Sequence, residues 1–226
     1  MNKYIILSEK KWHSELYVNL KNYFINDEWI YINSKNNFNL VKLEEINPTK
    51  IFIPHWSYII TSRIYNKYEC IVFHMTDLPY GRGGSPLQNL IIRGHKETKI
   101  SAIKISQGID TGDIYLKKNL ILNGTAKEIF LTACPIIEDM IKEIIQNNIK
   151  PIPQFGNIVE FKRRTPEESN IMYLNDVKTI YDYIRMLDCD GYPKAFIETD
   201  SIRIEFSNAH LSTENNLKAD VRIFKK

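Results

Sequence analysis

Two segments that follow apolar, strand-like runs contain residue types able to move protons. The first, residues 74–86, reads His-Met-Thr-Asp-Leu-Pro-Tyr-Gly-Arg-Gly-Gly-Ser-Pro, and the second, residues 109–114, reads Ile-Asp-Thr-Gly-Asp-Ile. Taken alone, His74 is best interpreted as a hydrogen-bonded histidine at a strand end, and Asp110 as a turn residue that caps backbone amides. In open α/β sheets the carboxyl ends of strands also hold ligands. The two segments are therefore candidates for one site.

Both segments resemble the signature of the folate-dependent formyltransferases, which reads Asn-x-His-x-Ser-Leu-Leu-Pro, then Arg-Gly-x-x-Pro, then Asp-x-Gly. Nine residues fall on those positions: His74, Thr76, Leu78, Pro79, Arg82, Gly83, Pro86, Asp110 and Gly112. The separation of His74 from Asp110, 110 − 74 = 36 positions, is also similar. The match departs where it matters most for the chemistry, two positions before the histidine. Val72 stands where the family has asparagine, and valine cannot donate a hydrogen bond.

The resemblance implies transfer of a formyl group from 10-formyltetrahydrofolate to a primary amine. Such a site must stabilise an oxyanion, remove an amine proton and protonate the leaving folate nitrogen. By resemblance, His74 stabilises the tetrahedral intermediate and shuttles the proton, and Asp110 holds the imidazole and favours its charged form. Thr76, Gln88, Asn89 and backbone N–H groups are candidates for the oxyanion donor that Val72 cannot supply.

By the same resemblance, residues 56–60 lie in the loop that grips the pterin ring, and two residues before Asp110 belong to the folate side. The expected folate contacts are Trp56, Ser57, Tyr58, Ile59, Ile60, Gly108 and Ile109. The competing interpretation of residues 56–60 is a buried aromatic cluster that packs helix against sheet. His55 is either a second acid–base group or a polar residue at a strand end. None of the histidines has metal-ligand spacing, so we expect no metal.

The acceptor is indicated by a second resemblance, which covers residues 161–169, 181–186 and 192–196. These stretches are similar to the formyltransferase that modifies UDP-4-amino-4-deoxy-arabinose. We therefore expect a UDP- or dTDP-linked amino sugar as acceptor, with Arg82, Arg163 and Arg164 on the substrate side. Guanidinium groups match phosphate oxygens, so Arg163 and Arg164 suit a diphosphate. The alternative for this pair is ion pairing with Glu167 and Glu168.

Other interpretations of the same residues remain open. The acceptor can instead be an aminoacyl group bound to a peptide synthetase, or methionyl-tRNA. Val72 is also compatible with a protein that binds folate or sugar nucleotide without catalysis. A net charge of +3 is small for a protein that grips a polyanion, so we expect no nucleic-acid partner. Exposed elements of the C-terminal part are compatible with a homodimer.

The composition and apolar pattern indicate a cytoplasmic, globular α/β protein. The chain has 226 residues, 43% of them hydrophobic, and no run approaches the roughly 18 apolar residues of a membrane span. Cys70, Cys134 and Cys189 are far apart, which favours buried reduced thiols. Strand-like and amphipathic runs alternate, which predicts a Rossmann-like, mostly parallel twisted sheet that finishes in mixed orientation.

We expect a catalytic domain over residues 1–150, a linker over residues 151–174 and a small β-rich α+β subdomain over residues 175–226. Within the first domain, Thr125 and Glu128 have the spacing of a capping box, so a long helix is expected to begin there. Its expected apolar face is Ile129, Ala133, Ile136, Ile137, Met140, Ile141 and Ile144, and Pro135 should kink it.

Overall fold

The computed structural model describes residues 1–213 and 215–226, and its contacts divide the chain into two compact units. We call the first the sheet unit. It comprises residues 1–82, 99–120 and 131–160. We call the second the hairpin unit. It comprises residues 83–98, 121–130 and 161–226. Several elements run from one unit into the other.

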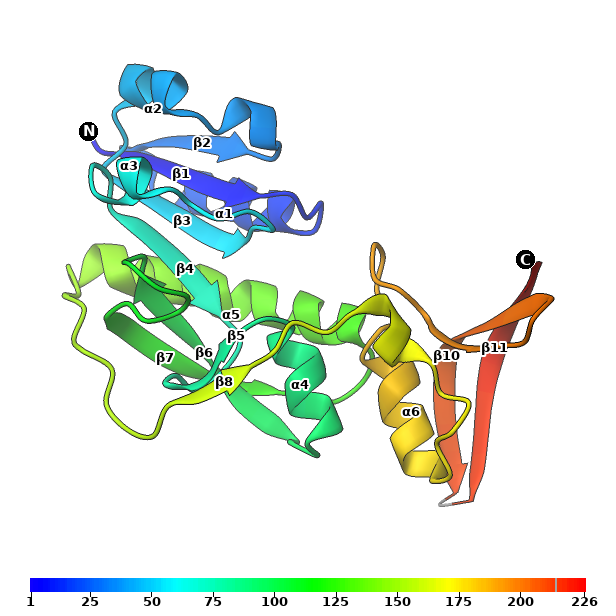
Figure 1. Ribbon diagram of the computed structural model, residues 1–226. Helices are drawn as coiled ribbons and strands as arrows, with labels where there is room; N and C mark the ends of the chain where they lie inside the picture. The colour runs from blue at the N-terminus through cyan, green and yellow to red at the C-terminus, as the bar shows by residue number, and fades with distance from the viewer. Residues whose placement is uncertain (214) are drawn as a thin grey trace. The chain divides into compact units, whose positions relative to one another are not determined.

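The sheet unit is built on a six-stranded sheet with the order β2-β1-β3-β4-β6-β7 (Figure 1). The pairs β1–β2, β1–β3 and β3–β4 are parallel, whereas β4 and β6 are antiparallel. This confirms the expected, mostly parallel sheet with a mixed edge. The strands are β1 (Lys3–Ser8), β2 (Glu28–Ile32), β3 (Lys50–His55), β4 (Cys70–His74), β6 (Glu97–Lys104) and β7 (Ile114–Ile121).

The central strands form because their apolar runs are buried on both faces, as parallel strands covered by helices require. Residues 4–8 of β1 and 51–54 of β3 are all buried. Ile5, Leu7, Ile51 and Ile53 belong to one core cluster on the sheet. The strands β1, β3 and β4 run parallel, so their carboxyl ends meet at one edge of the sheet. That edge carries His74, the last residue of β4.

Helices and short helical turns connect these strands. Leu16 and Leu20 are buried at helical spacing on α1 (His13–Tyr23). At the start of α2 (Leu40–Ile46), the Asn39 side chain accepts a hydrogen bond from the Lys42 N–H. The long helix α5 (Ala126–Gln146) runs through Pro135 without interruption. All residues of its expected apolar face are buried except Ile136, which is half-buried. The elements are α1 (His13–Tyr23), η1 (Lys35–Asn37), α2 (Leu40–Ile46), α3 (Ser62–Tyr65) and α5 (Ala126–Gln146).

The hairpin unit contains a three-stranded antiparallel sheet with the order β11-β10-β9. The helix α6 (Val177–Arg185) packs against this sheet. The expected C-terminal β-rich structure is thus present. Arg185 is held by Asp182 of the same helix at 2.6 Å, and it ties the helix into the unit by donating to the carbonyl oxygens of Leu122 and Gly124. The elements are α4 (Pro86–Ile92), η2 (Pro166–Ser169), α6 (Val177–Arg185), β9 (Ala195–Glu198), β10 (Ile202–Thr213) and β11 (Asn216–Lys225).

The division between the units is not the linear one expected from sequence. Residues 151–160 belong to the sheet unit, and residues 83–98 and 121–130 belong to the hairpin unit, where α4 packs with α6. Part of the expected linker is also a strand. β5 (Tyr80–Gly83) and β8 (Val159–Phe161) form a two-stranded sheet that the sequence pattern does not reveal.

The capping box at the start of α5 gives a pH-dependent prediction. The Thr125 N–H and hydroxyl donate to Glu128 Oε2 at 2.8 and 2.9 Å. These two hydrogen bonds hold the pKa of Glu128 below its usual 4.5, and the bond from the Thr125 backbone N–H has the larger effect. A lowered pKa in the folded state stabilises the protein above the unfolded-state pKa, and this contribution disappears as the pH falls through the folded-state value.

We therefore expect Glu128→Gln to lower the free energy of unfolding at pH 7, and the difference from wild type to shrink below about pH 4. Urea unfolding followed across this range measures both. Glu45→Gln, an exposed carboxylate on α2, is the control. A difference between Glu128→Gln and wild type that stays constant from pH 7 down through the acidic range would contradict the assignment.

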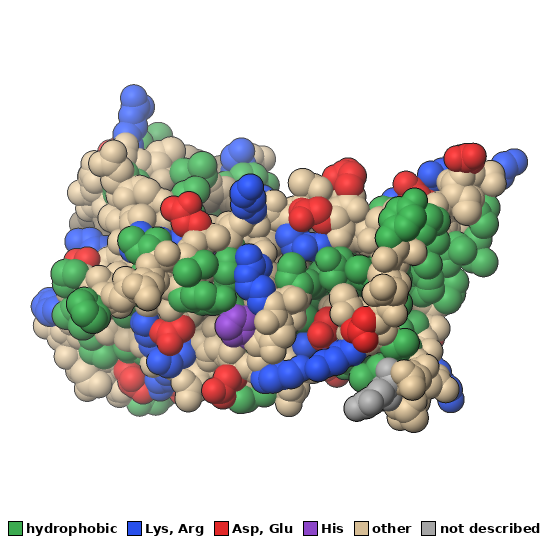
Figure 2. All heavy atoms as spheres, turned by 60° about the horizontal axis from the view of Figure 1, so that its bottom comes forward, with side chains coloured by type: hydrophobic (Ala, Val, Ile, Leu, Met, Phe, Trp, Pro, Cys, Tyr) green, Lys and Arg blue, Asp and Glu red, His purple; other side chains and the backbone are tan. Residues whose placement is uncertain are grey.

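Two properties of the whole described chain bear on its surroundings. No helix among residues 1–213 and 215–226 is long and apolar enough to cross a membrane. Basic and acidic side chains are interspersed on the face drawn in Figure 2. This mixture fits the small net charge of +3.

Candidate active site

His74 ends β4 at the carboxyl edge of the sheet, with its side chain 8% exposed. Its Nε2 lies 2.8 Å from the carbonyl oxygen of Gly81. A carbonyl oxygen only accepts hydrogen bonds, so Nε2 carries the proton of this contact. Nδ1, the other ring nitrogen, is on the side of Asp110.

Asp110 lies in the turn between β6 and β7, and the structure brings it to His74. Its Oδ2 is 3.4 Å from His74 Nδ1, and its side chain is 16% exposed. The turn is tight, because Asp110 has a left-handed φ of 52° and a Cβ at Gly112 would lie 1.6 Å from the carbonyl oxygen of Lys104. An imidazole and a carboxylate 36 positions apart (110 − 74) thus face each other at one sheet edge.

The segment that joins His74 to Gly81 is held to the sheet by polar contacts. Ser101 Oγ donates to the Thr76 carbonyl oxygen at 2.6 Å and accepts from the Leu78 N–H at 3.3 Å. The buried Thr76 hydroxyl donates to the Gly81 carbonyl oxygen at 3.3 Å. Thr76 therefore lies beside His74, but its hydroxyl proton already has a backbone acceptor.

Gln88 and Asn89, the other expected oxyanion donors, lie on α4 in the hairpin unit, and their amide groups hold the backbone of that unit. Gln88 Nε2 donates to the Met186 carbonyl oxygen at 3.1 Å. Asn89 Nδ2 contacts the carbonyl oxygens of Gly84, Ser85 and Lys162 at 2.9–3.1 Å. An NH₂ group has two hydrogens, so Asn89 keeps none for an oxyanion. The sequence indicated that Gln88 and Asn89 carry amide groups, but it could not indicate which carbonyl oxygens these groups contact.

Val72 occupies the position at which the family signature has asparagine. Its backbone pairs in register with Ile53 of β3. Its half-buried side chain packs against apolar clusters of the sheet unit that include Leu78 and Ile103. The departure from the signature is therefore accommodated as core packing, and this side chain provides no hydrogen-bond donor.

The expected folate loop, residues 56–60, is mostly at the surface. The Trp56 ring packs against Tyr58 at 5.5 Å and Phe38 at 5.8 Å between ring centroids. Ser57 is exposed, Ile59 is 88% exposed and only Ile60, at 8%, is part of the core. The alternative of an aromatic cluster that packs on the core describes Trp56, which lies against the core cluster with Phe38, but not the exposed Ser57 and Ile59. The residues before Asp110 are exposed too, Gly108 with a φ of 98° and Ile109 at 69% exposure.

A cavity of about 600 Å³ lies in the sheet unit between α3 and the end of β6. Its lining residues closely follow the 56–60 segment or directly precede Gly108 in sequence. They are Ser62, Tyr65, Asn66, Lys104, Ile105, Ser106 and Gln107. The volume is in the range of small-molecule sites. The expected folate residues themselves are not in this lining, and the sequence analysis did not single out the residues that are.

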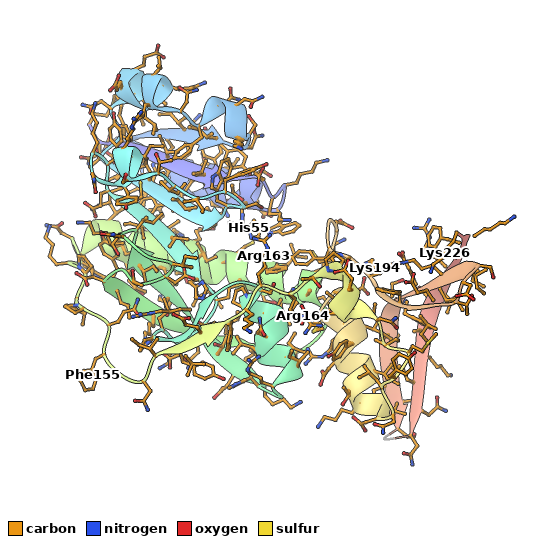
Figure 3. The ribbon with its side chains drawn as sticks, in the orientation of Figure 1. His55, Phe155, Arg163, Arg164, Lys194 and Lys226 are labelled. Carbon is orange, nitrogen blue, oxygen red and sulfur yellow. The ribbon has the colours of Figure 1, made fainter. Side chains whose placement is uncertain are left out.

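His55 lies at the carboxyl end of β3, as Figure 3 shows. Burial, with a smaller contribution from nearby Lys10, lowers the pKa of His55 to about 4. Its ring is therefore neutral near pH 7, which does not suit a general acid. His13, whose Nδ1 lies 2.7 Å from the Ser8 hydroxyl, has its pKa lowered to about 3, mainly by burial. Within the described residues, no group of acidic, histidine or cysteine side chains has the arrangement of a metal site.

The three expected substrate arginines have different environments. Arg82 Nε and Nη2 donate to Gln154 Oε1 at 3.1 and 2.8 Å within the sheet unit. In the hairpin unit, Arg164 Nη2 donates to the Glu168 carbonyl oxygen at 2.6 Å, and its guanidinium lies over Tyr183. Arg163 is exposed. The ion-pair alternative therefore applies to Arg164 through Glu168, and Arg163 is the arginine of this pair with an accessible side chain.

Comparisons with known proteins agree with this geometry. Residues 166–224 match the family model described as methionyl-tRNA formyltransferase, C-terminal domain. The solved structure of methionyl-tRNA formyltransferase from Clostridium thermocellum is 47% identical, with a TM-score of 0.96 and 100% of both chains covered. A sugar N-formyltransferase from Shewanella sp FDAARGOS_354 shares the fold at 18% identity, with a TM-score of 0.69 over 88% of this chain and 94% of that one.

Among curated relatives, the methionyl-tRNA formyltransferase of Clostridium botulinum (strain Alaska E43 / Type E3) is 29% identical over 172 residues. That match covers 73% of this chain and 55% of the relative, so the chain spans about half the length of this relative. Identity of 47% over both chains of the Clostridium thermocellum comparison is far above the level at which only the fold is shared. The chain therefore belongs to the formyltransferase family.

Proposed function

We propose that this chain transfers the formyl group of 10-formyltetrahydrofolate to a primary amine, and that the amine belongs to methionyl-tRNA. The observation that carries the reaction type is His74 Nδ1 facing Asp110 Oδ2 at 3.4 Å at the carboxyl edge of the sheet. The acceptor is supported by the names of the similar proteins, which refer to methionyl-tRNA. This favours one of the alternatives drawn from the sequence over the amino sugar, and it is at odds with the expected lack of a nucleic-acid partner.

The chemistry fits the two side chains. The amine nitrogen bonds to the formyl carbon, the bond from that carbon to the folate nitrogen breaks, and one proton passes from the amine to the folate nitrogen. His74 moves that proton, and Asp110 orients the ring and stabilises it when it is charged. Thr76, Gln88 and Asn89 all donate to backbone carbonyl oxygens. The oxyanion contact falls to backbone N–H groups and to the His74 Nε2–H or the Thr76 hydroxyl, either of which would exchange the Gly81 carbonyl oxygen for the oxyanion.

The folate is proposed to bind along residues 56–60 and 108–109, next to the cavity between α3 and β6. These segments lie in the same unit as His74 and Asp110, and most of their residues are exposed. The cavity is lined mostly by polar side chains, among them Ser62 and Asn66, so it offers hydrogen-bonding groups to a ligand. Burial of the exposed Ile59 and Ile109 by a flat ring would be favourable.

A nucleotide-linked amino sugar is the second candidate acceptor. The observation in its favour is the exposed guanidinium of Arg163, which suits a diphosphate. Arg164 gives no such support, because it is held on Glu168 and Tyr183. The likeness to the Shewanella enzyme concerns the fold alone and does not identify the acceptor.

The acceptor is tested by supplying 10-formyltetrahydrofolate, labelled in the formyl carbon, with either methionyl-tRNA or a UDP-4-amino sugar. We expect label in acid-precipitable tRNA at a rate at least about tenfold above that with the sugar nucleotide, because an acceptor that matches the site gains transition-state binding. Label in the sugar nucleotide alone would replace tRNA by the second candidate. No transfer to either acceptor, together with tight folate binding, would favour a protein that binds folate without catalysis.

A further inference from the structure

Gln154 makes a complete set of side-chain contacts although it lies in an exposed segment. Its Nε2 donates to the carbonyl oxygens of Asp110 and Gly112, both at 2.8 Å. Its Oε1 accepts from Arg82 Nε at 3.1 Å and Nη2 at 2.8 Å. Both amide hydrogens and both lone pairs of the amide oxygen are thus engaged, which is all that a glutamine side chain can offer. The amide therefore connects Arg82 to the turn that carries Asp110.

The partial burial of Gln154 agrees with a structural role for its side chain. Between positions 152 and 158 it is the residue that is not exposed. An isolated polar side chain withdrawn from water is stabilised only when its hydrogen bonds are made within the protein. The contacts of Gln154 therefore define one orientation of its amide.

One partner of this amide is the turn that carries Asp110. The turn has little freedom of its own, because Asp110 has a left-handed φ and Gly112 lies against the Lys104 carbonyl oxygen. Gln154 holds this turn by donating hydrogen bonds to two of its backbone carbonyl oxygens, and not to the Asp110 carboxylate. That carboxylate is then directed at His74 Nδ1, 3.4 Å away.

The other partner is β5. Arg82 lies on this strand, and the preceding residue, Gly81, accepts the hydrogen bond from His74 Nε2 at 2.8 Å. The contacts therefore form a closed circuit within the sheet unit. It runs from His74 to Gly81, along the chain to Arg82, across to Gln154, on to Asp110 and back to His74. His74 Nε2 is held by the Gly81 carbonyl oxygen and Nδ1 faces the Asp110 carboxylate. Gln154 links the two segments that carry these groups, through Arg82 on one side and the Asp110 turn on the other.

We propose that Gln154 is a positioning residue that sets the orientation of Asp110 toward His74, and that Arg82 acts through Gln154 and not on the acceptor. The inference rests on the proposed formyl transfer, because it assigns Gln154 a part in that reaction. It also revises the sequence-based expectation that Arg82 binds substrate.

The role requires an amide, which provides matched variants. Gln154→Glu keeps the size of the side chain and an acceptor for Arg82, but it cannot donate to the Asp110 and Gly112 carbonyl oxygens and places a negative charge against them. Gln154→Ala removes both sets of contacts. Gln146→Ala is the control, because Gln146 is an exposed glutamine at the end of α5 whose side chain donates to the Tyr23 hydroxyl.

The test measures kcat and KM for formyl transfer in each variant whose thermal unfolding matches wild type. We expect Gln154→Ala and Gln154→Glu to lower kcat by about 10- to 100-fold, because misplacement of a catalytic group by about 1 Å has an effect of this size, with KM values nearly unchanged. In an Asp110→Asn background the same substitutions should cause no further loss, because Gln154 acts through Asp110. Wild-type kcat in Gln154→Glu, or losses that multiply with Asp110→Asn, would overturn the proposal.

The imidazole ¹⁵N spectrum of His74 provides a readout that does not depend on turnover. We expect Gln154→Glu and Asp110→Asn to shift the His74 ring nitrogens alike, and Gln146→Ala to leave them at the wild-type positions. Unshifted His74 signals in Gln154→Glu would overturn the proposal. Absence of transfer by wild type with every acceptor would count against the proposed function instead, and the spectra would still decide the role of Gln154.

Discussion

Replacing His74 by alanine is expected to lower the rate of formyl transfer by about 100- to 10,000-fold, the usual contribution of a positioned acid–base group. The ring is 8% exposed and its two nitrogens face Asp110 and Gly81, so its removal takes away the proton carrier of the site. Single-turnover transfer of labelled formyl measures the effect. The β4 ladder does not use the side chain, so the fold should be retained, with some loss of stability from removing a buried ring and its hydrogen bond to Gly81.

The matched control for this prediction is His210→Ala. His210 lies on β10, is exposed and contacts Asn208, so its loss should leave the transfer rate at the wild-type value. Circular dichroism and thermal unfolding establish that both variants are folded. A His74→Ala protein that is folded and transfers formyl at the wild-type rate would show that the chemistry lies elsewhere.

Gly112→Ala is expected to destabilise the protein by about 3 kcal/mol, the upper end of the usual range for overpacking. The added Cβ would lie 1.6 Å from the Lys104 carbonyl oxygen, which belongs to the backbone at the end of β6 and cannot rotate away. The turn must shift, and it carries Asp110 with it. We also expect transfer to fall by about 100-fold, as a displacement of about 1 Å implies.

Gly94→Ala separates this clash from the ordinary cost of a side chain at a glycine position. Gly94 has a φ of 78° and nothing within 4 Å of an added Cβ, so only backbone strain of about 1–2 kcal/mol is expected, with full transfer activity. Urea unfolding and transfer assays compare the two variants. Equal unfolding free energies and full activity in Gly112→Ala would contradict the tight turn.

The alternation of apolar runs predicted most of the sheet and its helices. Residues 4–7, 51–54 and 70–73 are continuous apolar runs, and such runs become buried strands when helices cover both faces of a sheet. The capping box at Thr125 likewise predicted the start of α5. These features depend on neighbours in sequence, which is why the pattern alone revealed them.

Features that depend on distant partners could not be predicted in this way. β5 and β8 are short, and their residues show no clear alternation of apolar and polar side chains. Pairing between the two segments makes them strands, and a local sequence pattern does not reveal such pairing. Gln88 and Asn89 have the right groups for an oxyanion, but tertiary contacts engage those groups. Gln154 was missed because it touches Asp110 across 154 − 110 = 44 positions.

The candidate site itself was predicted mainly from motif resemblance. The sequence contained an imidazole and a carboxylate in separate segments, and general strand-end rules placed each at a sheet edge. Only the fold brings His74 Nδ1 and Asp110 Oδ2 to 3.4 Å. The contact of Arg164 with Glu168 is the alternative that the sequence had indicated, whereas the contact of Arg82 with Gln154 could not be read from the sequence, and substrate binding by these arginines stays a prediction.

The most direct test of the central claim, that His74 and Asp110 act as one unit in formyl transfer, is a double-mutant cycle. Rates are measured for wild type, His74→Ala, Asp110→Asn and the double variant with 10-formyltetrahydrofolate and methionyl-tRNA. We predict that Asp110→Asn slows wild type by about 100-fold or more but changes the rate of His74→Ala by less than about twofold, as for residues that work together. Losses that multiply in the double variant would contradict the account.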